Sequence, residues 1–191
     1  MQLAAFSQVD AVALECLAER TIVPGLRACQ PDPNKGYDVR LPRRLRPLLP
    51  AAHADDVSVL SNMGAANPAG AARRAAEPAQ DLGLSGLRIA GVIGDDVLAA
   101  QQHNSWDEPV NGTLLGAHAY IGAEALQIAV ADGANLVLTG RAADSALFGA
   151  PAVPMLDGSL DALVGATAVG HLLECSGQVT GGTSRCRMGQ A

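Results

Sequence analysis

The sequence predicts an α/β protein with an open doubly wound, mostly parallel sheet and helices on both faces. Short apolar runs of strand length alternate with longer stretches of helical pattern. The runs are solidly apolar, as expected for parallel strands covered on both sides. We count four to five strands, and a (β/α)8 barrel would need eight. These observations favour the open sheet.

The first quarter of the chain supplies one strand and two helical stretches. Residues 9–14 predict a buried strand. Residues 18–28 predict a helix, which Pro24-Gly25 should interrupt, or an irregular segment. The Pro, Asp, Asn and Gly content of residues 30–36 indicates a loop. Residues 41–52 have the leucine spacing of a helix but contain three prolines. A proline inside a helix costs about 3 kcal/mol, so we expect a kinked or short helix.

The second strand and its helix enclose the most informative segment, SNMGAANP at residues 61–68. Residues 57–60 predict the strand and residues 69–82 the helix, with Pro78 as a local break and Gly83 as the C-cap. Asn67 is a good N-cap residue. A strand that ends in small and amide residues before a helix is typical of a ligand crevice in open α/β proteins.

The remaining elements repeat the alternation. A strand is predicted over 87–93, followed by Gly94-Asp95-Asp96 and a short helix to about Gln101. Residues 103–112 predict a surface loop with the single Trp106, and residues 114–120 are ambiguous between strand and loop. A helix over 124–131, a strand over 136–138 and an amphipathic helix over 160–175 follow.

Composition and charge exclude several classes of partner. The net charge of -6, with no basic stripe interleaved with aromatics, argues against nucleic acid and anionic membranes. No apolar run is long enough to span a membrane, and the N-terminus lacks the basic region of a signal peptide. We therefore expect a cytoplasmic protein.

The four cysteines and four histidines form no metal-binding pattern. Reduced thiols are the plainer interpretation, and Cys16 and Cys175 are expected in the core. The sequence contains no GxSxG, Walker loop or GxGxxG. It therefore predicts no metal and no cofactor.

Polar residues gather where the apolar runs stop. In a parallel sheet these ends lie on the edge where ligands bind. The predicted substrate-binding residues are Asn62, Gly64, Asn67, Gly140, Arg141 and Asp144.

Two of these strand ends leave alternatives open. Arg141 could clamp a carboxylate or phosphate, or it could pair with Asp144 three residues on. Asp95 and Asp96 could bind a metal or act as a base, but N-capping by Asp95 is favoured.

Glu15 and His118 are the catalytic candidates. Glu15 follows an apolar strand, where burial would raise its pKa and suit a general base. His118 lies among small residues and could act as acid or base, or be a buried structural histidine. His171 and Glu174 share a helix face, which favours a hydrogen-bonded latch.

Several segments, in order, resemble the N-terminal domain of the acyclic terpene utilisation (AtuA) family. The likeness spans roughly residues 9 to 182. The matching pieces are LECLAERT from Leu14, SNMGAANP from Ser61, GLSGLRIAGVIGDD from Gly83, AHAYIGA from Ala117, DGANLVLTGRAADSALF from Asp132 and GHLLECSGQVTGG from Gly170.

The resemblance implies a role in breaking down acyclic terpenes, or similar branched acids handled as CoA thioesters, in bacteria. Compared with the family pattern, a strand and a Gly-rich turn are missing before the first strand, and the chain stops early. We therefore expect a partial domain over 1–182 and an irregular tail over 183–191, apparently truncated at both ends.

Three functions remain open at this point. The first is an enzyme or enzyme fragment acting on a branched acyl-CoA, with hydration, lyase or hydrolytic chemistry. The second is a non-catalytic ligand-binding or assembly subunit, and the third is a non-functional remnant. The expected partners are a small-molecule ligand, such as a CoA thioester, and further copies of the chain in a homo-oligomer.

Overall fold

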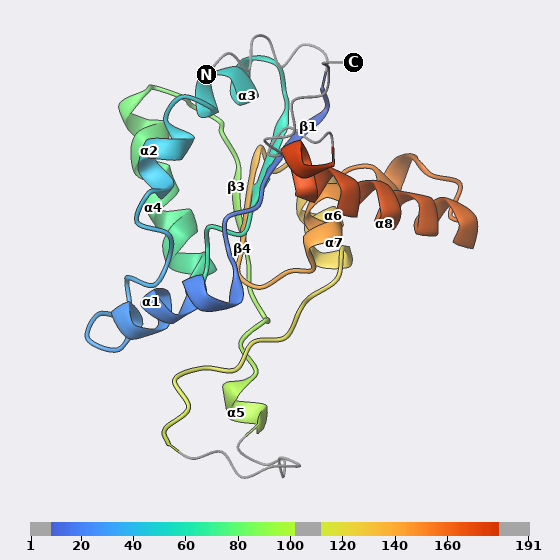
Figure 1. The fold of residues 1–191 in the computed structure, drawn as a ribbon. Helices are drawn as coiled ribbons and strands as arrows, with labels where there is room; N and C mark the ends of the chain where they lie inside the picture. The colour runs from blue at the N-terminus through green and yellow to red at the C-terminus, as the bar shows by residue number, and fades with distance from the viewer. Residues whose placement is uncertain (1–8, 102–111, 180–191) are drawn as a thin grey trace, which may run out of the picture.

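A four-stranded, all-parallel sheet forms the centre of the protein (Figure 1). The computed structural model describes residues 9–101 and 112–179. The strand order is β1-β2-β4-β3. The strands are β1 Ala11–Leu14, β2 Ser58–Ser61, β3 Ile89–Val92 and β4 Leu136–Thr139. The predicted α/β class and parallel sheet are confirmed.

Helices cover both faces of the sheet (Figure 1). One face carries α2, α3 and α4, whereas α6 and α7 lie on the other. The long helix α8 packs on α7. The helices are α1 Glu19–Cys29, α2 Leu41–Leu45, α3 Leu49–Ala54, α4 Pro68–Asp81, α5 Leu98–Gln101, α6 Glu124–Ala131, α7 Asp144–Gly149 and α8 Leu160–Cys175, with short 3-10 turns at Val153–Met155 and Ser176–Gln178.

The chain winds in two directions across the sheet. It moves from β1 to the neighbouring β2, and then through α4 past one strand to β3. It returns through α5 and α6 to β4, which lies between β2 and β3. Because α4 and α6 cover opposite faces, the sheet is doubly wound, as the sequence predicts.

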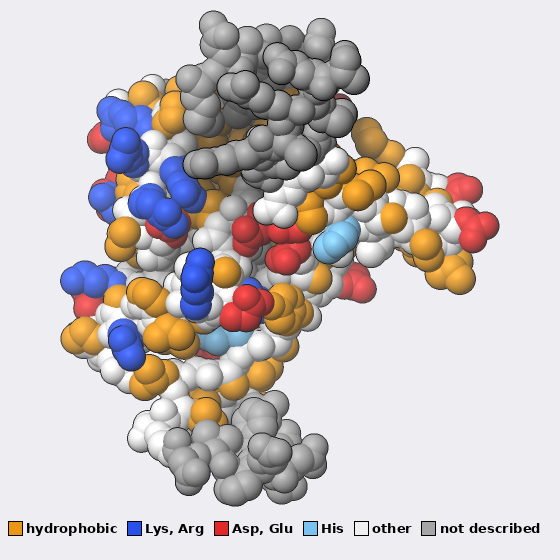
Figure 2. Space-filling model, viewed as in Figure 1, with side chains coloured by type: hydrophobic (Ala, Val, Ile, Leu, Met, Phe, Trp, Pro, Cys, Tyr) orange, Lys and Arg blue, Asp and Glu red, His pale blue; other side chains and the backbone are white. Residues whose placement is uncertain are grey.

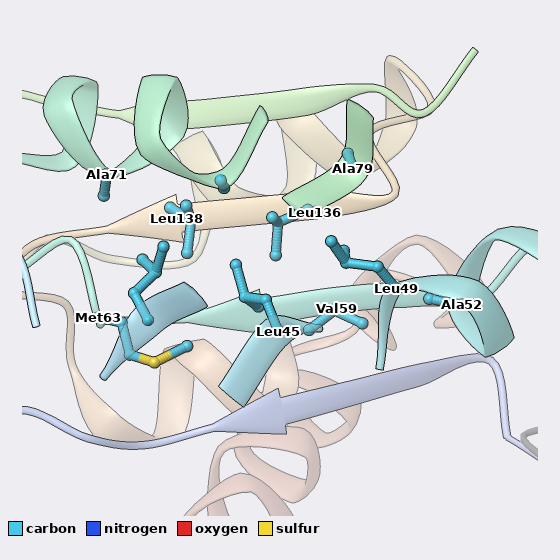
Figure 3. Packing of buried hydrophobic residues seen from close by; sticks show 11 residues of the cluster. Leu45, Leu49, Ala52, Val59, Met63, Ala71, Ala79, Leu136 and Leu138 are labelled. Carbon is cyan, nitrogen blue, oxygen red and sulfur yellow. The ribbon is translucent and has the colours of Figure 1, made fainter. Parts of the chain in front are cut away.

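The alternation of side chains along the central strands divides the core into two halves. Val59 and Leu136 are fully buried in the cluster with α2, α3 and α4. Leu60 and Val137, their sequence neighbours, are fully buried on the other face against α6 and α7. Figure 3 shows the first cluster, with Leu45 close to the sheet side chains. Because neighbouring side chains point to opposite faces and both faces are covered, the middle of each central strand is apolar at consecutive positions.

Two predicted helix breaks are wrong. α1 continues through Pro24, and α4 continues through Pro78. Each proline removes one backbone hydrogen bond, but both helices also pack through buried residues that offset this loss. In α1 the buried Gly25 packs closely against the loop, because an added Cβ would lie 2.6 Å from the Gly36 carbonyl oxygen.

The proline-rich stretch 41–52 forms two short helices, where the sequence predicts a single kinked or short one. Pro42 and Pro50 lie in the first turns of α2 and α3, where a missing N–H has no cost. Pro47 lies between the two helices. The predicted stop at Gly83 is also confirmed, since this glycine follows the end of α4 with a φ of +68°.

Residues 114–120 form no regular strand. His118 and Ile121 make isolated bridges to Asp96 and Ala142, so the segment crosses the carboxyl ends of β3 and β4. Most of the predicted loop 103–112, with Trp106, and the tail 183–191 lie outside the described residues. Among the described helices, none has the length and apolar character needed to cross a membrane.

Candidate functional site

The winding direction changes between β2 and β4, and this places two predicted strand-end segments side by side. After β2 the chain enters α4 on one face, whereas after β4 it enters α7 on the other. Ligands of open α/β sheets bind where adjacent strands diverge in this way. Gly64 lies against β4 so closely that an added Cβ would be 2.5 Å from the Thr139 carbonyl oxygen. Gly140 is similarly confined by the Ala65 carbonyl oxygen, at 2.7 Å from an added Cβ.

Asn62 links the ends of β1 and β2. It is 2% exposed, its Oδ1 accepts a hydrogen bond from the Cys16 amide at 2.7 Å, and its Nδ2 donates to Glu15 Oε1 at 3.0 Å. The same Glu15 oxygen accepts from the Leu17 amide at 2.7 Å. Glu15 and Asn62 are therefore brought together as predicted, and Asn62 fixes the orientation of the Glu15 carboxylate.

A second group joins the ends of β3 and β4 to the segment that crosses them. Asp95 is 3% exposed, and its Oδ2 accepts a hydrogen bond from the Arg141 amide at 2.8 Å. The same oxygen lies 2.9 Å from His118 Nδ1. His118 Nε2 is buried and has no hydrogen-bond partner among the described residues. An imidazole held at one nitrogen by a carboxylate, with the other nitrogen free, is the arrangement of a general base.

The favoured N-cap role of Asp95 is wrong. The neighbouring Asp96 is exposed and its Oδ1 accepts from the Leu98 amide at 3.0 Å, at the start of α5. Asp95 points instead into the protein. Its partners, Arg141 and His118, lie 46 and 23 residues away in the sequence. Sequence reasoning missed this role because the pattern Gly94-Asp95-Asp96 offers two equivalent caps.

Arg141 is 5% exposed and does not form the alternative ion pair with Asp144. Its Nη1 donates to the Leu17 carbonyl oxygen at 3.1 Å and lies 3.8 Å from Glu19 Oε1. The guanidinium carbon is 5.0 Å from the Tyr120 ring centroid, within the range of a cation–π interaction. Arg141 therefore holds the turn after β1 in place.

Asp144 begins α7 and lies near other acidic side chains. Partial burial raises the pKa of its carboxyl group, and the nearby Glu15 and Glu174 carboxylates raise it further, against the opposing charge of Arg141. Figure 2 shows acidic side chains near the middle of this face, between the basic side chains over α2 and the apolar ones of α8. A carboxyl group with a raised pKa beside a second carboxylate is suited to proton transfer.

Asn67 is engaged in structure. Its Oδ1 accepts from the Gly70 amide at 2.8 Å, which confirms the predicted N-cap of α4. Its Nδ2 donates to the carbonyl oxygens of Pro33 and Lys35 at 2.9 and 2.7 Å. Asn67 thus attaches the loop after α1 to α4, and both of its polar atoms have partners inside the protein.

Two cavities open beside these residues. The first, about 410 Å³, lies between α1, the segment 37–40 and the end of β2, and its mostly apolar wall includes Asn62 and Met63. The second, about 570 Å³, includes Glu15 and three arginines of residues 40–44. Both cavities are lined by Cys16 and Arg40. His118 and Arg141 line neither cavity.

Cys16 lies between the cavities and is a free thiol, as are Cys29 and Cys175 in the described part of the chain. Burial raises the pKa of the Cys16 thiol, and the charge of Arg44 only partly opposes this. Arg44 Nη1 lies 2.6 Å from the Cys16 sulfur. The thiol therefore remains protonated near neutral pH, which agrees with the expectation that Cys16 is not a nucleophile.

The geometry gives no metal site within residues 9–101 and 112–179, because no group of histidine, cysteine and acidic side chains there could hold an ion. Comparison with known proteins yields one family: the model of the acyclic terpene utilisation family protein AtuA matches residues 1–187. This match includes residues 1–8, which the resemblance left out. Neither the curated proteins nor the solved structures contain a match. Because the match covers nearly the whole chain, the protein belongs to the AtuA family, and membership implies involvement in acyclic terpene utilisation.

Proposed function

We propose that this protein is an enzyme that binds a branched acyl compound, carried as a CoA thioester, and moves a proton at or near its carbonyl group. The observation that carries the proposal is the mostly apolar cavity of about 410 Å³ at the end of β2. Its volume lies within the ~300–1,000 Å³ of small-molecule sites. An apolar wall suits a branched hydrocarbon chain, and the family supplies the acyclic terpene context.

Glu15 is the proposed proton-transfer residue. One carboxylate oxygen is held by Asn62 and by the Leu17 amide, so the group is oriented before a ligand binds. Glu15 lines the second cavity beside Cys16, which also lines the first. Asp144 lies near enough for the Glu15 carboxylate to help raise its pKa, and it can supply the acid of an acid–base pair.

His118 is the second proposed catalytic residue. Its Nε2 has no hydrogen-bond partner in the part of the chain that the structure describes, and Asp95 orients the ring. Because this nitrogen is buried, the residues around it have to move for a ligand to reach it. Glu15 is therefore the residue whose replacement should affect activity first.

Enzymatic function is tested by incubating the protein with a panel of branched terpenoid CoA esters and following products by mass spectrometry. We expect turnover that Glu15→Gln lowers by about 10²–10⁴-fold, the range of general acid–base catalysis. Turnover that Glu15→Gln and His118→Asn leave unchanged would contradict both assignments.

Ligand binding in the first cavity is tested separately. Ala28 lines this cavity, so Ala28→Phe should fill it and weaken binding at least about tenfold. Ala131→Phe, on the exposed end of α6, is the matched control and should have no effect. Equal affinities of the two variants would place the ligand elsewhere.

A non-catalytic ligand-binding subunit is the second candidate. The observation that favours it is that Asn62 and Arg141 make their hydrogen bonds within the protein. Asn62 therefore supports the wall of the first cavity directly, and Arg141 supports it from behind through the Leu17 carbonyl, so neither side chain is placed to meet a substrate carbonyl. Binding that Ala28→Phe abolishes, without turnover of any ester, would support this candidate over the enzyme.

A further inference from the structure

Basic side chains are concentrated in one short segment of an acidic protein. The chain has 13 Lys and Arg residues and a net charge of -6, yet Arg40, Arg43, Arg44 and Arg46 fall within seven consecutive positions at α2. Figure 2 shows basic side chains gathered over α2 and α4. The first three of these arginines line the second cavity, of about 570 Å³.

The arginines of this cavity differ in how they are held. Arg40 forms a two-point ion pair with Asp38, from Nε at 2.9 Å and from Nη2 at 2.8 Å. Arg44 lies 3.7 Å from the same carboxylate and contacts the Cys16 sulfur. Arg43 has no hydrogen bond or ion pair with any residue of the described chain. Asp38 therefore fixes the guanidinium of Arg40, and Arg44 divides its contacts between Asp38 and Cys16. The guanidinium of Arg43 is available to bind a ligand.

The cavity keeps a positive charge in spite of its acidic neighbours. Burial raises the pKa of Asp38, but the hydrogen bonds and the charge of Arg40 outweigh this effect, so the pKa lies below its usual value and Asp38 stays ionised. Glu15 is the carboxylate that lines the cavity itself. Three guanidinium groups thus face two carboxylates, which leaves an excess of positive charge for an anion.

We propose that this cavity is a phosphate-binding subsite, in which Arg43 and Arg44 bind the phosphate groups of the ligand. Guanidinium groups bind phosphate through paired N–H donors, and two of them suit a group with several oxygens, such as a diphosphate. Since the two cavities share Cys16 and Arg40, a ligand can extend from the apolar cavity into the basic one. The acyl chain then lies beside α1, the thioester near Cys16 and the phosphates at α2. This inference rests on the proposed function for the identity of the acyl part.

The test is isothermal titration calorimetry of the full chain with two probes, coenzyme A and inorganic pyrophosphate. We expect saturable binding that weakens as the salt concentration rises, since salt screens charges. Arg43→Gln should lower affinity at least about tenfold, a change that corresponds to ~1.4 kcal/mol. Arg43 is the best position because its side chain has no partner to lose within residues 9–101 and 112–179. Arg44→Gln should act in the same direction.

The control is Arg27→Gln, which removes the same charge. Arg27 is an exposed residue of α1 and lines neither cavity. Tighter binding of coenzyme A than of pyrophosphate identifies a nucleotide carrier, whereas equal affinities identify a free phosphate ligand, and both support the subsite. Lack of binding by either probe, or equal affinities of Arg43→Gln and Arg27→Gln, would overturn it. If the protein binds pyrophosphate but converts none of the CoA esters, the result counts against the proposed function and leaves the phosphate-binding subsite standing.

Discussion

Replacing Asp95 should destabilise the protein far more than replacing its neighbour Asp96, although the two residues look equivalent in the sequence. Asp95→Ala removes the acceptor of the buried Arg141 amide and the partner of His118 Nδ1. A buried polar group left without a partner costs about 1–3 kcal/mol, so two such groups predict a loss of ~2–5 kcal/mol after some relaxation. Asp96→Ala removes one exposed hydrogen bond at the start of α5, worth about 0.5–1 kcal/mol.

Urea unfolding at pH 7, followed by far-UV circular dichroism, measures both losses. Small domains are stable by about 5–15 kcal/mol, so Asp95→Ala should still fold, with a clearly lower midpoint. Asp95→Asn keeps one acceptor and should fall between the alanine variant and the wild type. If the free energies of unfolding of the two alanine variants agree within about 0.5 kcal/mol, the buried role of Asp95 is refuted.

Three further predictions follow from the same strand-end region. Gly64→Ala should lower the free energy of unfolding by about 1–3 kcal/mol, because the new Cβ would press on the Thr139 backbone. Gly165→Ala, at an open position of α8, should raise it by ~0.5–1 kcal/mol, and equal urea midpoints for the two variants would contradict this prediction. Asn67→Ala should lower the free energy of unfolding by ~1–3 kcal/mol, because it removes both the cap of α4 and the contacts to the loop. Ser159→Ala, which removes only the exposed cap of α8, should lower it by less than about 1 kcal/mol, and equal melting temperatures of the two variants would contradict this prediction. Since the pKa of Asp144 is raised in the folded state by burial and by Glu15 and Glu174, its ionised form is disfavoured there, so the stability that it contributes is lost as pH rises through the folded pKa. Asp144→Asn should therefore be more stable than the wild type at pH 7, with the difference disappearing below the ordinary aspartate pKa of about 3.9; a difference that does not depend on pH would disprove the shift.

The fold could be predicted largely because apolar periodicity determines it. The apolar run at β4 reflects burial on both faces of the sheet. The prolines of 41–52 keep the helices there short, because proline is tolerated in the first turn of a helix but not in its interior. The breaks expected at Pro24 and Pro78 failed, since tertiary packing of the buried helix faces outweighs a single missing hydrogen bond. Propensity gives way to burial at such positions.

The candidate site was harder to predict than the fold. Two contacts follow from strands that lie next to each other: Glu15 bonds to Asn62, and Gly64 lies against β4. The sequence indicates such contacts because these residues stand where the apolar strands end. The partner of His118 depends on where residues 114–120 cross the sheet, and no periodicity marks that path. The sequence also did not indicate that Arg40, Arg43 and Arg44 line a cavity, because this depends on α2 lying beside the end of β1.

The packing of α8 has a consequence for how the protein opens. Gly170 is the buried residue of this helix, and an added Cβ there would strike the backbone of Ser145 in α7. Leu160, Val164 and Leu172 remain more than half exposed, at 75%, 59% and 52%. With so little apolar area holding it, α8 should unfold locally while the sheet stays intact, as a cooperative unit of its own. Its amide hydrogens should therefore exchange with deuterium well before those of β2 and β4.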